Sequence, residues 1–397
     1  MSSHPLSRRS MLRGIAAGAI GAPMIALFGE TGLASARTDA SPNADGTLPV
    51  TVTNNSGKAG NDAVRLYVIG TDAGGTQVHA DADGNLTPVS VSDNGSDGFT
   101  DYSIPLSGSG DTTIQLPKMS GRIYVAFGDP LKLKAVPDGN GKPSLAYPAG
   151  WVKDDPNYPV LHDFVEFTHN DDGMFCNTTA VDMFAIPMSL HLTGSADQTT
   201  GTIPAGGRAA IFSELAGQAG FDQLVLEDLR VMAPGHGIET GAFANDYFDS
   251  YVNDVWAKYA NEKLTVHTDQ GDRTGQVSGD TFTFDGGVAG FAKPSTLDIF
   301  YCNGALSAPN DGVTGPVAAI LGAGFNRSTL LSSTEQPTSD PGGFYGTDVT
   351  NHYARILHAH TEDGKAYGFP FDDVGGFASY IQDNAPSALQ LTLTAFD

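Results

Sequence analysis

The sequence predicts a mainly β protein with a mixed α/β segment in its middle. Beyond residue 47, both ends of the chain consist of short runs of strand-forming residues separated by Gly, Asn and Asp, which is typical of a β-sandwich or barrel. Between them, residues 243–263 carry apolar residues at three- and four-residue steps, and this spacing predicts an amphipathic helix. We therefore expect a β lobe built from both ends and a mixed α/β lobe over roughly residues 190–300.

The first half of the chain contains the clearest strand signals. Alternating or β-branched runs predict strands at residues 50–54, 63–69, 111–116 and 121–127. In the second of these, Arg65 and Tyr67 share one face, while Val64, Leu66 and Val68 share the other. The DADGN run at 81–85 lacks the full spacing of a calcium loop and predicts a hairpin turn instead.

The middle and the tail are more mixed. The stripe formed by Phe248, Tyr251, Val252, Val255 and Tyr259 is more typical of helix core than of a sugar-stacking platform. Strands are expected at 264–268 and 281–284, and a helix around 317–322. The tail, 351–374, reads as strand and loop.

Two histidines in the tail raise the question of a metal. His358 and His360 would face the same side of a strand, but no third ligand is evident, so a metal site is not expected. The sequence contains no P-loop, no dinucleotide-binding fingerprint and no GxSxG nucleophile motif. We therefore expect no cofactor.

The N-terminus has the features of an export signal. Arg8-Arg9 within SRRSMLR is close to the twin-arginine pattern, and the apolar run 14–28 is too short to span a membrane. Ala34-Ser35-Ala36 is a small-residue cleavage site, so we expect residues 1–36 to be removed and residues 37–46 to form a loose segment. The expectation is a secreted, extracellular protein without membrane attachment after cleavage.

The net charge limits the classes of binding partner, and the two cysteines raise the question of a disulfide. The formal net charge is −24, from 21 basic and 45 acidic residues, which argues against nucleic acid and is compatible with a neutral polysaccharide. Cys176 and Cys302 are the two cysteines. An oxidising compartment would permit a disulfide, whereas folding before export in a reducing cytosol argues against one, so their pairing is left open.

Residues 163–187 contain the most informative stretch of the chain. Glu166 and Asp182 stand sixteen positions apart on either side of an Asp171-Asp172-Gly173 turn signal. If residues 178–186 form the returning strand of a pair folded about Met174, the two carboxylates lie opposite each other on one face. Two carboxylates roughly 5–10 Å apart are the apparatus of glycoside hydrolysis, although most same-face acidic pairs are merely solvated.

Three sequence blocks resemble one enzyme family. The segment DFVEFTHN with the following TTAVDMFAIPMSLHL, then NHYARILHAH, and finally YGFPFDDVGG resemble glycoside hydrolase family 64, over about residues 48–397. The resemblance implies a thaumatin-like fold, in which a β-sandwich or barrel lobe and an α/β lobe flank an open groove. It also implies an inverting β-1,3-glucanase that releases short laminari-oligosaccharides, notably the pentamer, with Glu166 as general acid and Asp182 as general base.

The resemblance also assigns substrate contacts. Thr168 and Asn170 match positions that line sugar subsites, and Phe175 stands where the family tends to have a tryptophan. Arg355 and Asp372 match the later blocks and are candidates for groove contacts, with a structural ion pair as the alternative. The implied partner is β-1,3-glucan, as in laminarin, curdlan or fungal cell walls, and the protein is expected to be a monomer that requires no metal.

A second function is compatible with the same fold. A non-catalytic β-1,3-glucan-binding or antifungal protein could use a thaumatin-like scaffold, because a fold alone does not determine function. The pair Glu166 and Asp182 discriminates between the two, since a binding protein has no need of both carboxylates.

Overall fold

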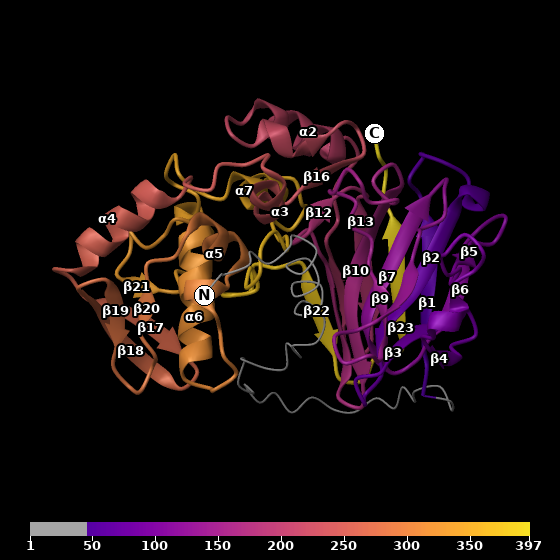
Figure 1. Ribbon diagram of the computed structural model, residues 1–397, viewed down its shortest axis with the longest axis horizontal. Helices are drawn as coiled ribbons and strands as arrows, with labels where there is room; N and C mark the ends of the chain where they lie inside the picture. Colours follow the sequence, from indigo (N-terminus) through magenta and orange to yellow (C-terminus); the bar gives the residue numbers. More distant parts are fainter. Residues whose placement is uncertain (1–45) are drawn as a thin grey trace, which may run out of the picture.

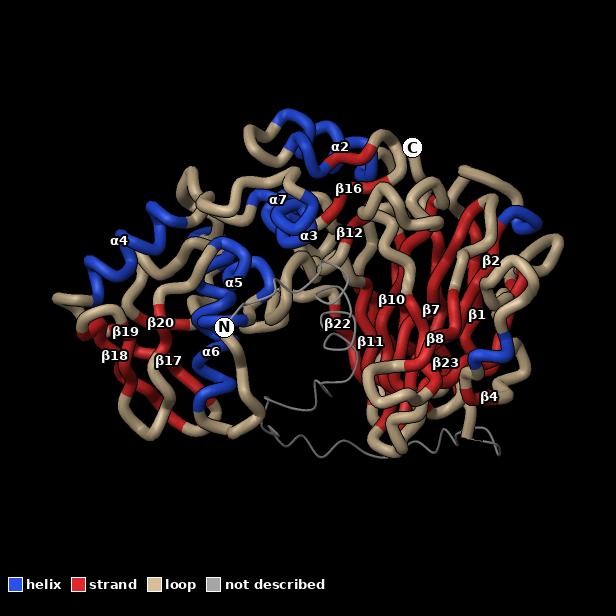
Figure 2. Tube along the Cα trace, viewed as in Figure 1, coloured by secondary structure: helices blue, strands red, loops and turns tan. Residues whose placement is uncertain are grey.

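The computed structural model describes residues 46–397, and these form two parts that lie side by side (Figure 1). A stack of long strands occupies one side, and a smaller sheet with helices occupies the other. Figure 2 shows the same division, with most strands in one half and most helices outside it. The expected class, mainly β with a mixed α/β part, is confirmed. The predicted signal peptide and all but the last residue of the predicted loose segment lie outside the described residues.

Two sheets form the β-sandwich. The five-stranded sheet has the order β14 (Asp197–Thr200), β13 (Met188–Thr193), β23 (Ala388–Leu393), β1 (Leu48–Asn54), β6 (Thr112–Leu116). The eight-stranded sheet has the order β22 (Tyr380–Asp383), β11 (Gly173–Thr178), β10 (Leu161–Asn170), β7 (Met119–Phe127), β2 (Val64–Thr71), β3 (Gln77–Ala80), β4 (Leu86–Pro88), with β5 (Ile104–Pro105) paired to β2. Because β1 and β23 pair in parallel, both ends of the described chain build one sheet, as predicted.

Side-chain alternation fills the space between the two sheets. Val64, Leu66 and Val68 of β2 are buried in the sandwich core, whereas Tyr67 of the same strand packs in a separate cluster on the outer face of the eight-stranded sheet. That outer cluster lies beside the short hairpin β8 (Lys134–Pro137) and β9 (Pro143–Ala146). The predicted two-faced strand is confirmed, and the eight-stranded sheet therefore has a second, partly polar face.

The mixed part contains the second large core. Its sheet has the order β20 (Phe291–Ala292), β19 (Thr281–Phe284), β18 (Gly271–Ser278), β17 (Leu264–Thr268), β21 (Glu335–Gln336). A small sheet of β12 (Met183–Phe184), β16 (Arg230–Met232) and β15 (Val225–Leu226) lies nearer the sandwich (Figure 1). The α-helices are α2 (Gly207–Gly217), α3 (Pro234–Thr240), α4 (Asp249–Tyr259), α5 (Thr296–Tyr301), α6 (Thr314–Asn326) and α7 (His352–Ala359).

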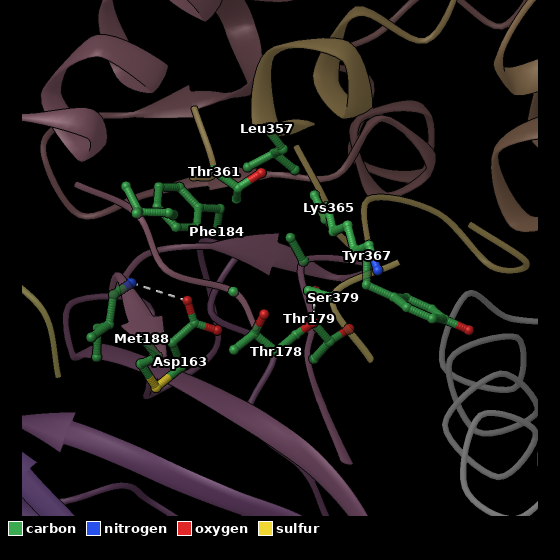
Figure 3. Close-up of a pocket in the computed structure, with 15 residues that line it drawn as sticks. Asp163, Thr178, Thr179, Phe184, Met188, Leu357, Thr361, Lys365, Tyr367 and Ser379 are labelled. Carbon is green, nitrogen blue, oxygen red and sulfur yellow. Dashed lines mark hydrogen bonds between the residues drawn. The ribbon is translucent and has the colours of Figure 1, made fainter. Parts of the chain in front are cut away.

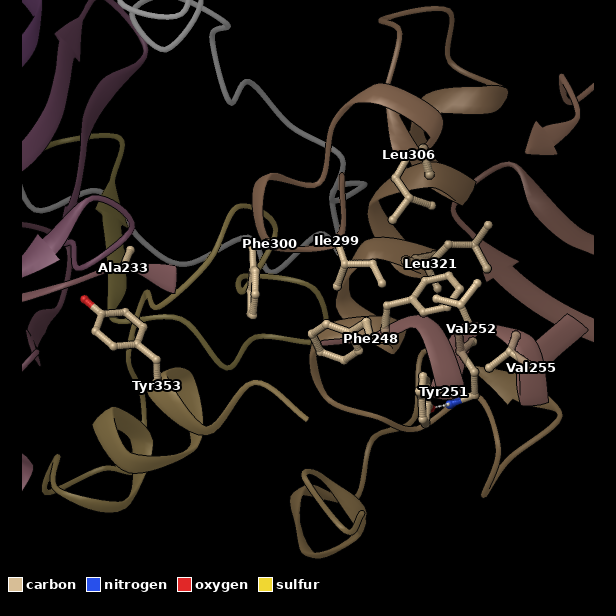
Figure 4. Close-up of a cluster of buried hydrophobic side chains, with 14 of the residues drawn as sticks. Ala233, Phe248, Tyr251, Val252, Val255, Ile299, Phe300, Leu306, Leu321 and Tyr353 are labelled. Carbon is tan, nitrogen blue, oxygen red and sulfur yellow. Dashed lines mark hydrogen bonds between the residues drawn. The ribbon is translucent and has the colours of Figure 1, made fainter. Parts of the chain in front are cut away.

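The aromatic stripe of α4 is helix core, as predicted. Phe248, at the start of the helix, and Tyr251, Val252 and Val255 meet residues of α5 and α6 in one apolar cluster (Figure 4). Helix α6 is buried over its whole length, which agrees with its apolar and small residues on every side. None of the helices within residues 46–397 is both long and apolar enough to span a membrane.

Two details differ from the sequence-based expectations, and the open question of the cysteine pairing is answered. The mixed part does not run from 190 to 300, because β13 and β14 pair within the sandwich while α6 and α7 pack in the helical core. The tail contains the helix α7 where strand and loop were expected, since the buried Tyr353, Ile356 and Leu357 recur at helical spacing. Cys176 and Cys302 are both free and buried in different clusters, so no disulfide joins them.

Candidate active site

Strand β10 presents a row of polar side chains on the outer face of the eight-stranded sheet. Glu166, Thr168 and Asn170 are partly exposed, whereas Val165 and Phe167, which alternate with them, are buried in the sandwich core. This alternation follows from the period of two in a strand and confirms that the three polar residues share one face. Thr168 donates a hydrogen bond to Ser120 of the neighbouring β7 at 3.0 Å.

The predicted pairing of Glu166 with Asp182 is wrong. The hairpin closes directly over Asp171 and Asp172, so the returning strand is β11 and the residue opposite Glu166 is Asn177. Gly173 allows this return with a φ of 131°, and it also allows β22 to approach, since a Cβ there would lie 2.1 Å from the backbone oxygen of Asp383. Asp182 lies beyond the end of β11, just before the short strand β12.

Arg122 of β7 nevertheless brings the two carboxylates together. It pairs directly with Glu166 in the sheet register. Its Nη2 lies 3.0 Å and its Nε 3.2 Å from Glu166 Oε1, while its Nη1 lies 3.4 Å from Asp182 Oδ2. The carboxylates thus occupy different edges of one guanidinium, whose flat face stacks over the Phe164 ring at 4.0 Å.

Asp182 has a second cationic neighbour on the helical side of the molecule. Its Oδ1 lies 3.1 Å from Nε2 of His236 in α3. The other ring nitrogen of His236 lies 3.1 Å from Glu239 Oε2 and 2.9 Å from the Tyr301 hydroxyl of α5. Trp151 stacks on the imidazole at 3.9 Å between ring centroids. The result is an alternating row of charges that crosses from the sandwich to the helices.

This row sets the protonation of Asp182. Burial alone would raise the pKa of Asp182, but the hydrogen bond from His236 and the charge of Arg122 lower it to about 2. Burial alone would lower the pKa of His236, but its hydrogen bonds to Asp182 and Glu239 raise it above 6.5. Near neutral pH, Asp182 is therefore an ionised carboxylate that keeps about 20% of its side chain accessible to solvent.

The backbone around Asp182 is fixed at several points. The peptide oxygen of Asp182 accepts a hydrogen bond from Ala233 N at 3.0 Å, and that of Ala180 accepts one from the Tyr353 hydroxyl at 2.7 Å. Buried Asp163 of β10 accepts from the N–H groups of Ala185 and Ile186 at 2.8 and 3.0 Å. The segment that carries Asp182 is thus attached both to β10 and to the helical part.

A pocket lies behind this segment, not in front of the carboxylates. Asp163, Phe184, Leu357, Lys365 and Tyr367 are among its lining residues (Figure 3). Its volume is about 40 Å³. Since one water needs roughly 10–15 Å³ of such space, the pocket admits water but not a sugar ring. Glu166, Thr168 and Asn170 lie outside this pocket, on the outer face of the eight-stranded sheet, where their side chains are partly exposed.

The other predicted contacts fall in different places. Phe175 lies on β11 rather than in a loop, opposite Thr168 and partly exposed on the same sheet face. Arg355 of α7 donates to His352 Nδ1 at 3.0 Å and to Gln218 at 3.4 Å. The structure therefore brings Phe175 to the row on β10 and gives Arg355 partners on helices.

Asp372 is not a groove contact. Its side chain is fully buried and lies 3.0 Å from Arg327 and 2.9 Å from His358, so the alternative reading as a structural ion pair is correct, but with Arg327 and not Arg355. His358 and His360 sit near the end of α7, not on a strand. His360 pairs with Glu214 of α2 at 2.7 Å. Within residues 46–397, no group of three or more potential ligand side chains could hold a metal ion.

Sequence reasoning missed Arg122, His236, Glu239, Tyr301 and Trp151. A signal existed for Arg122, which is the one charged residue in the strand run 119–127 and would have been expected to have a carboxylate partner. The stretch PGHGIET around His236 offers no comparable pattern, because the partners of His236 outside it, Asp182 and Tyr301, lie 54 and 65 positions away along the chain.

The chain is similar to known β-1,3-glucanases in sequence. Residues 46–393 match the profile of a family described as β-1,3-glucanase. Glucan endo-1,3-β-glucosidases of Cellulosimicrobium cellulans and of Arthrobacter sp. strain YCWD3 are each 35% identical over 88% of this chain, which spans 65% of their own length.

Solved structures give the same result. A laminaripentaose-producing β-1,3-glucanase in complex with laminaritetraose is 40% identical, with a TM-score of 0.82 over 89% of this chain and 99% of that one. A family 64 β-1,3-glucanase domain from Clostridium beijerinckii is 30% identical, with a TM-score of 0.77 over 88% of this chain and 98% of that domain. The chain therefore belongs to glycoside hydrolase family 64, the β-1,3-glucanase family.

Proposed function

We propose that the protein is an endo-acting β-1,3-glucan hydrolase that works with inversion, with Glu166 as general acid and Asp182 as general base. The observation that carries the proposal is the pair of partly exposed carboxylates on either edge of Arg122, in a chain of this family. Inverting enzymes need roughly 6.5–9.5 Å between their carboxyl groups to leave room for a water, and an intervening guanidinium suits such a separation.

The surroundings of the two carboxylates support this division of roles. Asp182 faces two cations, Arg122 and His236, whereas Glu166 faces Arg122 and the neutral amide of Asn177 at 3.3 Å. Glu166 is the proposed general acid, which gives a proton to the departing glycosidic oxygen. Asp182 stays ionised and accepts a proton from the water that attacks the anomeric carbon on the opposite face.

The same sheet face offers contacts for a chain of sugars. Thr168 and Asn170 present hydroxyl and amide groups beside Glu166, and Phe175 adds an apolar ring on the next strand. We propose that these residues bind glucosyl units of laminarin, curdlan or fungal cell-wall glucan. The related laminaripentaose-producing enzyme suggests short oligosaccharides, notably the pentamer, as products. The twin-arginine motif and the Ala34-Ser35-Ala36 site motivate the further proposal that the enzyme is secreted.

Two isosteric substitutions test the assignment. We expect Glu166→Gln and Asp182→Asn each to lower hydrolysis of laminarin by about 10²–10⁴-fold, because each removes one proton-transfer group and keeps its shape. Binding to insoluble curdlan and the thermal unfolding temperature should change little. Glu262→Gln and Asp254→Asn make the same chemical changes at exposed positions in the helical part and should retain full activity.

The stereochemistry of the product provides an independent check. Freshly released oligosaccharide should carry the α anomer, because water enters opposite the departing sugar. Proton NMR in the first minutes of the reaction distinguishes the anomers. A retained β anomer would contradict the inverting mechanism, and full activity in either substituted enzyme would show that the wrong carboxylates have been assigned.

A further inference from the structure

The imidazole of His236 lies between two carboxylates. Its Nε2 is 3.1 Å from Asp182 Oδ1, and its Nδ1 is 3.1 Å from Glu239 Oε2. A neutral imidazole can donate a hydrogen bond from only one ring nitrogen, whereas an imidazolium donates from both. Because both carboxylates can only accept when ionised, the doubly protonated ring is the form that donates to both of them.

Several neighbours fix the position of this ring. Its side chain is only 8% exposed, with Trp151 stacked on the ring at 3.9 Å and the Tyr301 hydroxyl 2.9 Å from Nδ1. Gly235 allows α5 to approach this closely, since a Cβ there would lie 2.6 Å from the Tyr301 ring. The ring therefore has little freedom to turn away from Asp182.

We propose that His236 is a positioning residue which, as an imidazolium held by Glu239 and Tyr301, fixes the orientation of the Asp182 carboxylate for activation of water. The inference rests on the proposed function and extends it to residues of α3 and α5. Asp182 lies in the segment that connects β11 of the sandwich with β12, while His236 and Glu239 belong to α3 and Tyr301 to α5. The helical part thus supplies the groups that hold the proposed base in place.

The charged groups around the His236 ring predict how activity should depend on pH if His236 positions Asp182. The groups that face His236 are Asp182, Glu239 and Tyr301, with Arg122 on the far side of Asp182. Glu239 stabilises the imidazolium, and its carboxylate is among the groups that raise the pKa of His236. Activity should therefore fall as the pH rises through that pKa, and removal of Glu239 should move this fall to lower pH.

Three substitutions in the full-length enzyme test the proposal with laminarin as substrate. We expect His236→Gln to lower kcat by about 10²-fold with little change in KM, since a misdirected catalytic group loses rate and not substrate affinity. Glu239→Gln should shift the high-pH limb of the kcat profile to lower pH. His267→Gln is the matched control, because His267 of β17 also lies between two carboxylates, Asp272 and Glu335, both at 2.8 Å, but its side chain is exposed.

The possible outcomes separate this inference from the proposed function. Wild-type kcat in His236→Gln, or an unmoved high-pH limb in Glu239→Gln, would overturn the positioning role while leaving the hydrolase intact. An inactive wild-type enzyme would overturn both at the first assay. If circular dichroism shows that His236→Gln does not fold, the pH profile of Glu239→Gln alone tests the positioning role of His236.

Discussion

At the scale of single residues, Arg122 determines the relation between the two carboxylates. Its guanidinium contacts Glu166 through Nε and Nη2 and Asp182 through Nη1, and it is largely shielded from solvent with 14% of its side chain exposed. Without this cation, two carboxylates would face each other across a partly desolvated space, which disfavours ionisation of both. Arg122 therefore allows two negative groups to share one site.

Replacing Arg122 should change the pH dependence of the reaction. Burial alone raises the pKa of Asp182, and Arg122 is one of the groups that lower it. In Arg122→Gln that pKa should rise, so the low-pH limb of the kcat/KM profile should move to higher pH by roughly one unit. Arg122→Lys keeps the charge and should show a smaller shift. A limb that stays in place in Arg122→Gln would mean that Asp182 is not the titrating base.

At the scale of elements, a buried ionic cluster joins α6, α7 and the 368–373 turn. Arg327 directly follows α6, and His358 lies in the last turn of α7. Both contact Asp372, which also accepts the Gly368 N–H at 2.9 Å. Three segments that are distant in sequence thus depend on one carboxylate, which explains why a charged residue occupies a fully buried position.

Removal of that carboxylate should affect stability and not chemistry. Asp372→Ala leaves Arg327 and His358 buried without their partner, and we expect it to lower the free energy of unfolding by about 3–5 kcal/mol. Urea denaturation measures the loss. Exposed Glu362→Ala is the control and should stay within about 0.5 kcal/mol of wild type. If Asp372→Ala folds but no longer binds curdlan, Asp372 contributes to substrate binding and the purely structural role is wrong.

The cluster should also give stability a pH dependence. Burial alone would lower the pKa of His358, but the charge and hydrogen bond of Asp372 raise it above 6.5. A group whose pKa is raised on folding contributes stability below its unfolded pKa and loses it as the pH rises through its folded pKa. This contribution should therefore be complete below pH 6.5 and decline above it in wild type, but be absent in Asp372→Ala.

At the scale of the whole molecule, two separate cores are held together without a disulfide between Cys176 and Cys302. Cys176 lies in the sandwich core, whereas Cys302 lies in a small cluster beside the helical core. Burial raises the pKa of both thiols above the ordinary value of 9.0, which disfavours the reactive thiolate. The contact between the two parts includes the charged row from Glu166 to Glu239.

Thiol titration checks this arrangement. We expect the native protein to show almost no reaction with a chromogenic thiol reagent, because both cysteines are buried. The protein unfolded in urea without reductant should show two reactive thiols. Reducing agent should leave the thermal unfolding temperature unchanged. Fewer than two thiols in the unfolded protein would indicate a disulfide that the structure does not contain.

Features that depend on local periodicity are predictable from the sequence alone. The period of two in a strand places Glu166, Thr168 and Asn170 on one face, and the helical spacing of the α4 stripe identifies it as core. The surroundings of Asp182, in contrast, depend on tertiary packing. The hairpin closes earlier than expected, so local pairing does not bring Asp182 to Glu166. Its neighbours Arg122 and His236 come from another strand and a helix, and His236 lies 54 positions away. Such contacts depend on how whole elements pack, because side-chain periodicity fixes the face of one element but not the element that will cover it.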